Sequence, residues 1–397
     1  MIAVPTGIRA FVASAPAVPS AARYRIEPAV MAAAERHGGA VVRTCHRIEW
    51  YHAGDEEPLS ILAADGASLP PEALSLSGME AVTRLVSLAL GLESAVLGED
   101  QILHQLRLAV ADARARGRFG GELALAFDLA LRAGRSGRTW RPARPSSIAD
   151  LAIQRAEAIA GPLTGRRVLV VGSGEMGRLA VGAARRRGAS VVVTSRDPAR
   201  THEAAARLGT EAWPFDPGEA LAEAAVVIVA LGGPWPLGGA SSEVLARGPV
   251  VVDVSMPAAL PEATVTALGG RHLGIDDLAS VGPDGAWAAV DDEPATRRYR
   301  ERLLRLRERT LASYRERVAV RHAAATARVL AERVESERRE VLETLFRGRP
   351  NLETADQDAI DAMTLRLTER LFGEALERLA KDGDDRGGRA VRDVFGL

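Results

Sequence analysis

The chain has 397 residues, of which 26% are charged and 47% hydrophobic, and its formal net charge is -1. This length exceeds what one hydrophobic core organises, so we expect two or three domains, and the balanced charge excludes a strongly basic nucleic-acid-binding protein. A single cysteine, Cys45, excludes an internal disulfide framework. We find neither a signal peptide nor about 18 consecutive apolar residues, so we expect a soluble cytoplasmic protein with no membrane partner.

The N-terminal part of the chain mixes strand-like and helix-like patterns, which predicts an α+β domain. Residues 8–14 and 40–51 are β-like runs. Ser77, followed three residues later by a glutamate, predicts a capped helix start ahead of an apolar run. Residues 138–145 contain two prolines and predict a linker, so we expect a first domain at residues 1–145.

The middle of the chain alternates apolar strands with helix-like stretches. Ser146 or Ser147 is expected to cap the helix that enters this part. Four short apolar runs then predict buried strands: Val168–Val171, Val191–Thr194, Ala225–Leu231 and Val250–Val254. Strands that alternate with helices indicate a parallel, doubly wound sheet, so we expect a Rossmann-type domain at residues 146–292.

The first of these strands is followed directly by a glycine-rich motif, Gly172-Ser173-Gly174-Glu175-Met176-Gly177, which opens a helix. The three glycines permit a tight turn, a close approach of the backbone to a pyrophosphate and close helix packing. The motif therefore predicts a dinucleotide site at the helix N-terminus. A glycine turn without a nucleotide is the alternative.

The end of the second strand favours NADPH as the cofactor. Ser195 and Arg196 stand where an NAD-dependent enzyme would have an acidic residue. A serine and an arginine can hold the 2′-phosphate of NADPH, which a carboxylate would repel. Asp197, one residue further on, is the feature that argues against this preference.

The residue pattern of the C-terminal part predicts a long helix with an apolar face that needs a packing partner. Between Pro294 and Gly348 there is neither glycine nor proline, and a helix of that length would span roughly 80 Å. Its apolar residues recur at helical spacing, as in Leu304, Leu311, Tyr314, Val318, Ala325 and Val329. A second helix is expected from Thr354 to Leu379. We therefore expect residues 293–397 to form a helical dimerisation domain that holds a homodimer.

Cys45 lies in the sequence Arg43-Thr44-Cys45-His46-Arg47. Cationic neighbours lower the pKa of a thiol and raise its thiolate fraction, which predicts a reactive cysteine. The alternative is a small buried side chain without chemistry, as most free cysteines are.

Three motifs in this order resemble those of the glutamyl-tRNA reductase family: Thr44-Cys45-His46-Arg47, the run GLESAVLGEDQIL from Gly91 to Leu103, and the glycine-rich motif. The resemblance extends to Asp276-Asp277-Leu278, to the long helical arm and to the last five residues, Asp393 to Leu397. It covers nearly the whole chain. It implies a multidomain α/β enzyme with an N-terminal catalytic domain, an NADP-binding Rossmann domain and a dimerisation arm.

The same resemblance implies the reaction and the role of each site residue. NADPH-dependent reduction would convert glutamyl-tRNA to glutamate-1-semialdehyde, the first step of 5-aminolevulinate and tetrapyrrole (porphyrin) biosynthesis. Cys45 would attack the ester that joins glutamate to tRNA and form a thioester, and Arg47 would pair with the substrate carboxylate. The other implied substrate-binding residues are Thr44, Ser94, Glu99, Asp100, Gln101 and Gln105. The implied partners are charged tRNA as substrate, a second copy of the chain and glutamate-semialdehyde aminomutase.

The sequence departs from the family pattern at three positions. His46 replaces an asparagine, Asp100 replaces a proline, and Arg84 stands where the family has a histidine that is important for activity. Arginine cannot give up its proton near neutral pH, so Arg84 can stabilise charge but cannot shuttle a proton. We therefore count His46 and Arg84 with Cys45 as catalytic positions, and His46 would take over the acid–base work. Neighbours in an extended strand point to opposite faces, which argues against that transfer.

Two other functions stay open. A paralogue could use the same thioester chemistry on another aminoacyl-tRNA, and a degenerate member could be a non-catalytic binding or regulatory module. The retained Cys45, Arg47 and glycine-rich motif argue against a module, because binding alone does not need all three.

The remaining polar residues indicate no metal site and two arginine-rich segments. The other histidines show no metal-ligand spacing, so no metal is expected. Nine arginines lie between His104 and Pro145, and ten lie between Arg297 and Arg321 with both ends counted. Such runs are usually solvated helix faces, but a tRNA substrate would make them candidates for phosphate contacts.

Overall fold

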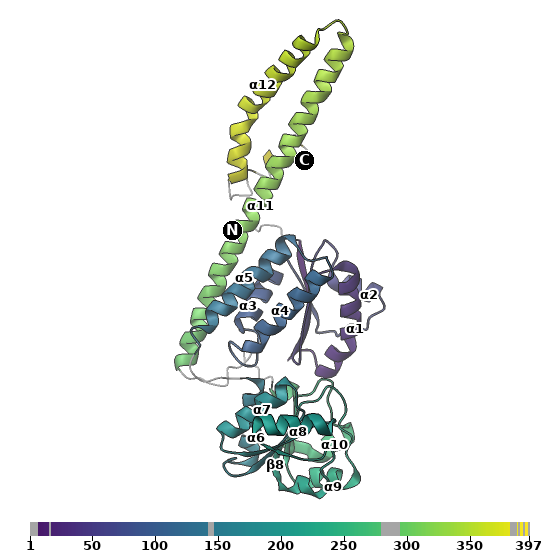
Figure 1. Ribbon diagram of the computed structural model, residues 1–397, viewed down its shortest axis with the longest axis vertical. Helices are drawn as coiled ribbons and strands as arrows, with labels where there is room; N and C mark the ends of the chain where they lie inside the picture. Colours follow the sequence, from purple (N-terminus) through teal and green to yellow (C-terminus); the bar gives the residue numbers. More distant parts are fainter. Residues whose placement is uncertain are drawn as a thin grey trace. The chain divides into compact units, whose positions relative to one another are not determined.

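The computed structural model describes residues 7–15, 17–141, 147–278 and 294–381, together with residues 387, 390, 391, 394 and 395. The chain forms two compact units, one from Gly7 to Thr310 and one that contains the described residues from Leu311 on. Figure 1 labels the α-helices of both units. Most of the expected C-terminal motif, Asp393 to Leu397, lies outside the described residues.

The first unit begins with a four-stranded antiparallel sheet in the order β2-β3-β1-β4. Its strands are β1 (Ile8–Ser14), β2 (Ala40–Thr44), β3 (Arg47–Ala53) and β4 (Leu74–Ser77). The predicted run at residues 8–14 is confirmed as β1. The run at residues 40–51 is wrong as a single strand, because Thr44 pairs with Arg47 and the chain turns back at Cys45 and His46.

The two residues of this turn are not usual turn formers, which is why the sequence pattern did not predict it. Glycine, proline, asparagine and aspartate mark most turns. No non-glycine residue in the described part of the chain has a positive φ, so the Cys45–His46 turn needs no left-handed residue. The turn places the thiol and the imidazole together at one end of the sheet.

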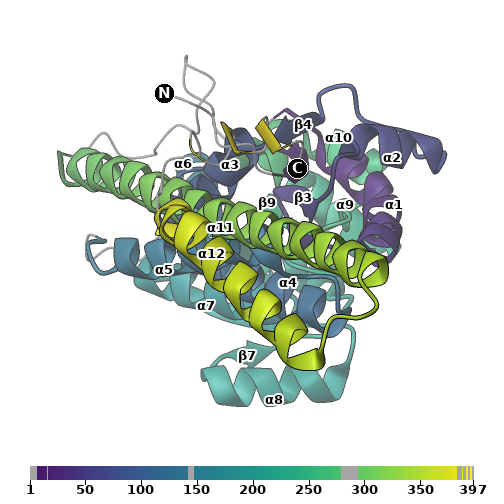
Figure 2. The ribbon, with the colours of Figure 1, turned by 90° about the horizontal axis from the view of Figure 1, so that it is seen from above.

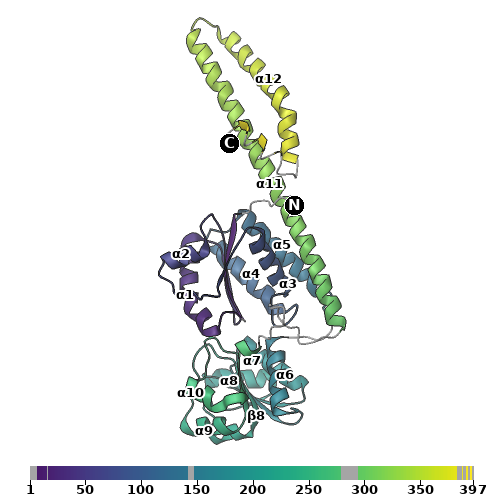
Figure 3. The same cartoon turned by 180° about the vertical axis from the view of Figure 1, so that it is seen from behind.

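Helices cover both faces of this sheet (Figure 1, Figure 3). The helices α1 (Ser20–His37) and α2 (Pro58–Ala64) lie on one face, and α3 (Met79–Leu90), α4 (Asp100–Ala115) and α5 (Gly121–Arg138) lie on the other. Phe11 of β1 and Trp50 of β3 are fully buried in a core that also contains Ile26 of α1. This packing holds the strands firmly, so the ends of β2 and β3 have defined positions.

The start of α3 differs from the sequence-based expectation. Ser77 is the last residue of β4 and pairs with Arg9, so it belongs to the sheet. The residue that precedes the helix is Gly78, which has a φ of 56° and makes no side-chain cap. The predicted Ser77 cap is therefore wrong, because sheet pairing occupies the residue that would have capped the helix.

A six-stranded parallel sheet follows, in the order β10-β9-β8-β5-β6-β7. Its strands are β5 (Arg167–Val171), β6 (Ser190–Thr194), β7 (Glu211–Ala212), β8 (Ala224–Val229), β9 (Val250–Asp253) and β10 (His272–Gly274). All four predicted strands are present, and the predicted doubly wound sheet is confirmed. The strand order reverses between β5 and β8, and open α/β sheets bind ligands outside the carboxyl ends of the strands at such a point.

Helices also cover both faces of the parallel sheet. They are α6 (Ile148–Ala160), α7 (Glu175–Arg186), α8 (Pro198–Leu208), α9 (Gly239–Arg247) and α10 (Glu262–Leu268), with short 3-10 helices at Gly218–Glu223, Gly269–Arg271 and Asp276–Leu278. Alternate residues of β5 enter two cores, because Val168 and Val170 pack with α6 and α7 whereas Leu169 and Val171 pack with α9 and α10. Ser147 opens α6 with a capping box, which confirms the predicted cap.

The arm consists of α11 (Pro294–Gly348), a single helix of 55 residues, and α12 (Thr354–Lys381), as the sequence predicts. Figure 2 shows both helices and the turn that joins them. Large apolar side chains stay exposed on the two helices, among them Val341, Leu345, Met363, Leu367 and Leu371. The arm therefore has an apolar surface that the described residues of the chain leave uncovered. Among the described residues, no helix combines the length and the apolar character needed to cross a bilayer.

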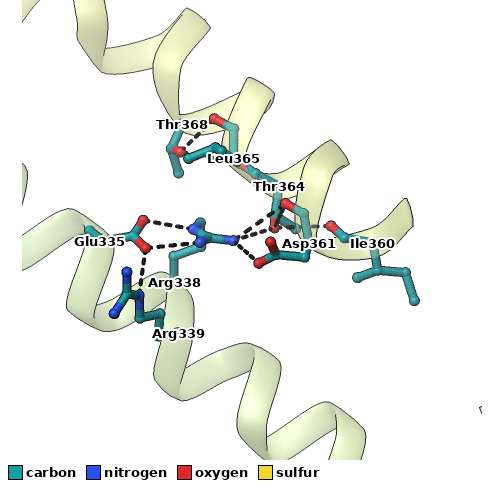
Figure 4. Close-up of polar contacts among 8 residues, drawn as sticks. All are labelled: Glu335, Arg338, Arg339, Ile360, Asp361, Thr364, Leu365 and Thr368. Carbon is teal, nitrogen blue, oxygen red and sulfur yellow. Dashed lines mark hydrogen bonds and ion pairs between the residues drawn. The ribbon is translucent and has the colours of Figure 1, made fainter. Parts of the chain in front are cut away.

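In the second unit, Arg338 joins α11 to α12 (Figure 4). Its guanidinium donates to Glu335 on its own helix and to Asp361 (2.6 Å) and Thr364 (3.1 Å) on α12. Hydrogen bonds from Arg338 and Arg339 lower the pKa of Glu335 to about 2, so this carboxylate is charged at neutral pH. The Arg338 side chain is only 9% exposed, which makes the cluster a partly buried polar link between the two helices.

Replacing Arg338 with methionine keeps the unbranched stem and removes the guanidinium. We expect this change to lower the stability of the arm by about 1 to 3 kcal/mol, because charge-assisted hydrogen bonds between the helices are lost. The matched control is Arg378→Met, since Arg378 is 79% exposed and pairs with Glu374 on the same helix. The midpoint of thermal unfolding at one fixed protein concentration should fall clearly for the first variant and hardly for the second. Equal midpoints for the two variants would contradict the assigned role.

Candidate active site

One cavity brings together most of the predicted catalytic and substrate-binding residues. It lies in the unit from Gly7 to Thr310 and has a volume of about 270 Å³. The antiparallel sheet and α4 with its N-terminal flank contribute Thr44, Cys45, His46, Arg47, Glu99, Gln101, Ile102 and Gln105. The parallel-sheet part contributes Ile148, Glu175, Met176, Ala230, Leu231 and Val254. The thiol therefore shares a cavity with the start of α7 and with the residues that follow β8 and β9.

His46 is held as a neutral ring next to the thiol. Its Nε2 lies 3.0 Å from the carbonyl oxygen of Ile275, and its Nδ1 lies 3.8 Å from the Sγ of Cys45. A carbonyl oxygen only accepts hydrogen bonds, so Nε2 carries the hydrogen and Nδ1 presents a lone pair toward Sγ. Burial, which the positive charges of Arg47 and Arg23 reinforce, lowers the pKa of His46 to about 4. The ring is therefore unprotonated at neutral pH.

Burial decides the protonation of Cys45. It raises the pKa of the thiol to about 12, and the nearby Glu99 carboxylate adds to this effect. Arg23 and Arg47 lower the pKa, as the sequence predicts for cationic neighbours, but burial outweighs them. The expectation of a low-pKa thiol is therefore wrong. Thiolate formation in this site needs a proton acceptor, and His46 is in place to be one.

Arg47 lies almost completely inside the protein, with 1% of its surface exposed. One terminal nitrogen donates to the carbonyl oxygen of Glu93, and the other lies 3.5 Å from Oε1 of Glu49. Its Nε is buried without a hydrogen-bond partner. These contacts anchor the guanidinium in the cavity wall and leave one donor without a partner.

Arg84 is not among the residues that line the cavity. From α3 it reaches Oε1 of Glu49 with one terminal nitrogen (2.7 Å) and Oε2 of Glu93 with the other (2.7 Å). Tyr51 also donates to Glu49 (2.6 Å). Burial alone would raise the pKa of Glu49, but Arg84 and Arg47 lower it below its ordinary value. Arg84 therefore balances a buried carboxylate that also lies next to Arg47.

The other predicted substrate-binding residues divide into two groups. Thr44, Glu99, Gln101 and Gln105 line the cavity, and the two glutamines share the same side of α4 as expected. Burial raises the pKa of Glu99 to about 7, against the effect of Arg47 and Arg138. Ser94 is buried with an Oγ that has no hydrogen-bond partner, and it is not among the lining residues.

Asp100 lies outside the cavity lining, and its side chain is 63% exposed. It is the first residue of α4, a position that favours both acidic residues and proline. Its carboxylate pairs with Arg138 (3.3 Å) and Arg141 (2.8 Å). The replacement of the family's proline by aspartate thus fits the helix start and adds two ion pairs.

The glycines of the glycine-rich motif stand where a larger side chain would clash or where the backbone is open. A Cβ on Gly172 would lie 2.2 Å from the carbonyl oxygen of Ala230, and one on Gly177 would lie 1.9 Å from that of Gly172. Gly174 has open space around it, and it precedes the first turn of α7. Ser173 completes the turn, and Glu175 and Met176 line the cavity. In the described residues, no group of three His, Cys, Asp or Glu side chains is arranged to hold a metal ion.

The residues after β6 differ in how accessible they are. The Ser195 hydroxyl is buried and lies 2.7 Å from that of Thr201. Arg196 is exposed, and its guanidinium lies beside Gly233 in the loop after β8. The Asp197 carboxylate accepts from the first backbone N–H groups of α8, so it acts as a helix cap. The Asp197 carboxylate, which argued against NADPH, is thus bound to the start of α8. The guanidinium of Arg196 remains exposed and could contact a phosphate.

The sequence pattern missed Arg23, which contacts the backbone of Cys45. Its side chain is fully buried, and one terminal nitrogen donates to the carbonyl oxygen of Cys45 (2.8 Å) and to Oδ1 of Asp276 (2.8 Å). Arg23 lies on α1, 22 residues before Cys45 and 253 before Asp276. Only the fold brings these three residues together. A buried arginine on a helix gave no local signal.

Comparison with known proteins divides the chain into three matched segments. Residues 11–140 match the model of the glutamyl-tRNAGlu reductase N-terminal domain. Residues 154–281 match that of shikimate / quinate 5-dehydrogenase, and residues 305–397 match that of the glutamyl-tRNAGlu reductase dimerisation domain. The middle segment is thus of the dehydrogenase type.

Similar proteins from other organisms span most of the chain. A glutamyl-tRNA reductase from Kineococcus radiotolerans is 31% identical over 90% of this chain and 84% of its own length. One from Methanopyrus kandleri is 31% identical over 90% of both chains. A solved structure of the Methanopyrus kandleri reductase aligns over 99% of both chains with 25% identity and a TM-score of 0.47. With relatives of this identity and coverage, the chain belongs to the glutamyl-tRNA reductase family.

Proposed function

We propose that this chain is an NADPH-dependent oxidoreductase that reduces glutamyl-tRNA to glutamate-1-semialdehyde through a thioester on Cys45. This reaction begins the synthesis of 5-aminolevulinate and of tetrapyrroles. The observation that carries the proposal is the shared cavity, in which Cys45 and Arg47 face the first residues of α7. Family membership supports the choice of substrate.

In the first step, Sγ of Cys45 attacks the ester carbonyl that joins glutamate to the ribose of tRNA. The thiol proton passes to Nδ1 of His46, which lies 3.8 Å away and presents a lone pair. The bond from the carbonyl carbon to the ribose oxygen breaks as the bond to sulfur forms. The proton then leaves His46 for the ribose oxygen, so the ring is neutral again.

Arg47 suits recognition of the glutamate side chain. A guanidinium can bind a carboxylate through two parallel hydrogen bonds, and a buried one discriminates against the neutral amide of glutamine. Ion-pair and backbone contacts hold Arg47 in place, and its Nε lacks a partner. Thr44, Gln101 and Gln105 supply further polar groups on the same wall, and Ser94 would join them if its unpartnered hydroxyl turned toward the substrate.

The residues that would hold NADPH are those of the glycine-rich motif, with Ser195 and Arg196 after the second strand. Backbone N–H groups at the start of α7 suit a pyrophosphate, and the exposed Arg196 suits a 2′-phosphate. Bound there, NADPH would supply the hydride that reduces the thioester. As the aldehyde leaves, the sulfur of Cys45 takes up a proton from water, which Nδ1 of His46 can relay because the ring lines the same cavity.

The proposal assigns one task to each part of the chain. Residues 1–145 would bind the glutamyl end of tRNA, residues 146–292 would bind NADPH, and residues 293–397 would hold a homodimer through their exposed apolar side chains. Arginines of the two arginine-rich segments would contact tRNA phosphates. The aldehyde would pass on to glutamate-semialdehyde aminomutase.

The nucleophile can be tested with Cys45→Ser. We expect this variant to form no aldehyde, because a serine hydroxyl of much higher pKa neither attacks nor leaves as a thiolate does. The assay uses purified protein, NADPH and a panel of charged tRNAs, and the wild type should yield aldehyde from glutamyl-tRNA alone. NADPH binding and the unfolding midpoint should match the wild type. Aldehyde formation by the variant would contradict the mechanism, and aldehyde from a different charged tRNA would assign another substrate.

Replacing His46 should slow the reaction, whereas replacing Arg84 should lower the stability of the fold. His46→Asn restores the family's residue but removes the proton acceptor, so thioester formation should slow by about 100-fold at an unchanged unfolding midpoint. Arg84→Met should instead lower stability by about 3 to 5 kcal/mol, because the Glu49 carboxylate loses its closest cation. Single-turnover thioester formation and thermal unfolding separate the two effects. A normal rate in His46→Asn would show that another group accepts the proton.

Cofactor preference can be tested with Arg196→Ala. The dissociation constant for NADPH should rise by roughly tenfold while that for NADH stays unchanged, because only NADPH has the phosphate that the guanidinium binds. Arg200→Ala is the control, since Arg200 is an exposed neighbour on α8 whose nearest carboxylate is the capping Asp197. Fluorescence titration measures all constants. Equal affinity of the wild type for both cofactors would overturn the preference.

A further inference from the structure

The segment that ends the parallel sheet contacts His46 of the Cys45–His46 turn directly and reaches Cys45 through Arg23. β10 ends at Gly274, and the next residue, Ile275, accepts a hydrogen bond at its carbonyl from Nε2 of His46 (3.0 Å). Asp276 then reaches Arg23, which donates to the carbonyl oxygen of Cys45. Two consecutive residues of the nucleotide-binding part therefore hold two consecutive residues of the turn.

Arg23 is the bridge in this arrangement. Its side chain is 0% exposed, and it lies 2.8 Å from both the Cys45 carbonyl oxygen and Oδ1 of Asp276. It also donates to the carbonyl oxygen of Val18. The other Asp276 oxygen accepts from the backbone N–H of Ser20 (2.8 Å), at the start of the same helix. The carboxylate thus fixes both the guanidinium and the end of α1 that carries it.

We propose that Asp276 and Arg23 are positioning residues for the nucleophile, which hold the Cys45–His46 turn so that Nδ1 of His46 faces Sγ of Cys45. This inference rests on the proposed role of Cys45 as the thioester-forming residue. The Sγ–H bond breaks as its proton moves to Nδ1. Meanwhile the N–H group at Nε2 keeps its hydrogen bond to the carbonyl oxygen of Ile275. Neither positioning residue touches the substrate or gains or loses a proton.

The burial of Arg23 distinguishes the Arg23–Asp276 ion pair from an ordinary ion pair at the protein surface. Exposed ion pairs contribute little, but a buried cation that loses its partner is strongly disfavoured. Burial alone would raise the pKa of Asp276, yet hydrogen bonds from Ser20 and Arg23 lower it below its ordinary value. Asp276 is therefore ionised at neutral pH and balances Arg23 directly beside the nucleophile's backbone.

The arrangement makes the thiol's proton acceptor depend on the nucleotide-binding part of the chain. Both the tautomer of His46 and the position of the Cys45 carbonyl depend on contacts with residues 275 and 276. These residues follow the last strand of the sheet that carries the glycine-rich motif. Thioester formation is thus tied to correct docking of that sheet, before any hydride is transferred.

Asp276→Asn is the direct test, because asparagine keeps an acceptor for Ser20 but loses the charge that holds Arg23. We expect single-turnover thioester formation from glutamyl-tRNA, without NADPH, to slow by about tenfold to a hundredfold, as small misplacements of reacting groups typically do. In steady state, kcat should fall while KM for glutamyl-tRNA stays unchanged. Alkylation of Cys45 by iodoacetamide, which needs no tRNA, should slow in parallel. NADPH affinity should equal that of the wild type.

Asp277→Asn is the matched control, since the neighbouring Asp277 accepts from the backbone N–H of Gly274 and is not hydrogen-bonded to Arg23. It should react as the wild type does. Arg23→Lys gives a second test if Asp276→Asn folds poorly, because lysine keeps the positive charge but not the rigid fork that reaches both acceptors. Its alkylation and thioester rates should fall as well.

The outcomes separate this inference from the proposed function. If Asp276→Asn and Arg23→Lys fold and react with iodoacetamide and with glutamyl-tRNA as fast as Asp277→Asn, the positioning role is wrong. If the wild type forms no thioester with glutamyl-tRNA, the proposed function is wrong, and alkylation still decides whether the bridge positions the thiol. A fall in alkylation rate confined to Asp276→Asn and Arg23→Lys supports the positioning role in either case.

Discussion

Desolvation of the Cys45–His46 turn, in which His46 is buried and Cys45 is partly buried, is the constraint on which the rest of the site depends. A thiol with a pKa of about 12 and a histidine with a pKa of about 4 are both neutral at physiological pH. In the proposed mechanism, reactivity then comes from transfer of the proton within the pair and not from a standing thiolate. Such a pair works only if its two groups are oriented, which is why contacts from distant parts of the chain converge on the turn.

The buried charges behind the cavity follow from the same constraint. Arg47, which selects the substrate carboxylate in the proposed function, is buried and lies next to the buried Glu49. Glu49 in turn accepts from Arg84, which also pairs with Glu93. The arginine at position 84 is therefore part of a charge-balanced cluster behind the substrate wall. Its place beside Glu49 gives a physical reason why a permanently charged side chain is tolerated where the family has a histidine.

Local patterns predicted those features that depend on local chemistry. The alternation of strands and helices, the glycine-rich turn and the long helix without glycine or proline each follow from backbone preferences over a few residues. The same reasoning failed where pairing between distant strands gave a residue a different secondary structure from the one its neighbours in the sequence indicate. Ser77 joined a sheet instead of capping a helix, and Cys45 and His46 formed a turn inside what looked like one strand.

The sequence by itself determined the parallel sheet, the glycine-rich turn and the arm, because motif spacing and periodicity are properties of neighbouring residues. Only the tertiary structure decided how the residues of the candidate site behave. It brought Arg23, Cys45 and Asp276 together across more than 250 positions and removed Arg84 and Asp100 from the cavity lining. It also reversed the expected direction of the thiol pKa, since desolvation depends on what packs around a group and not on which residues precede it in the chain.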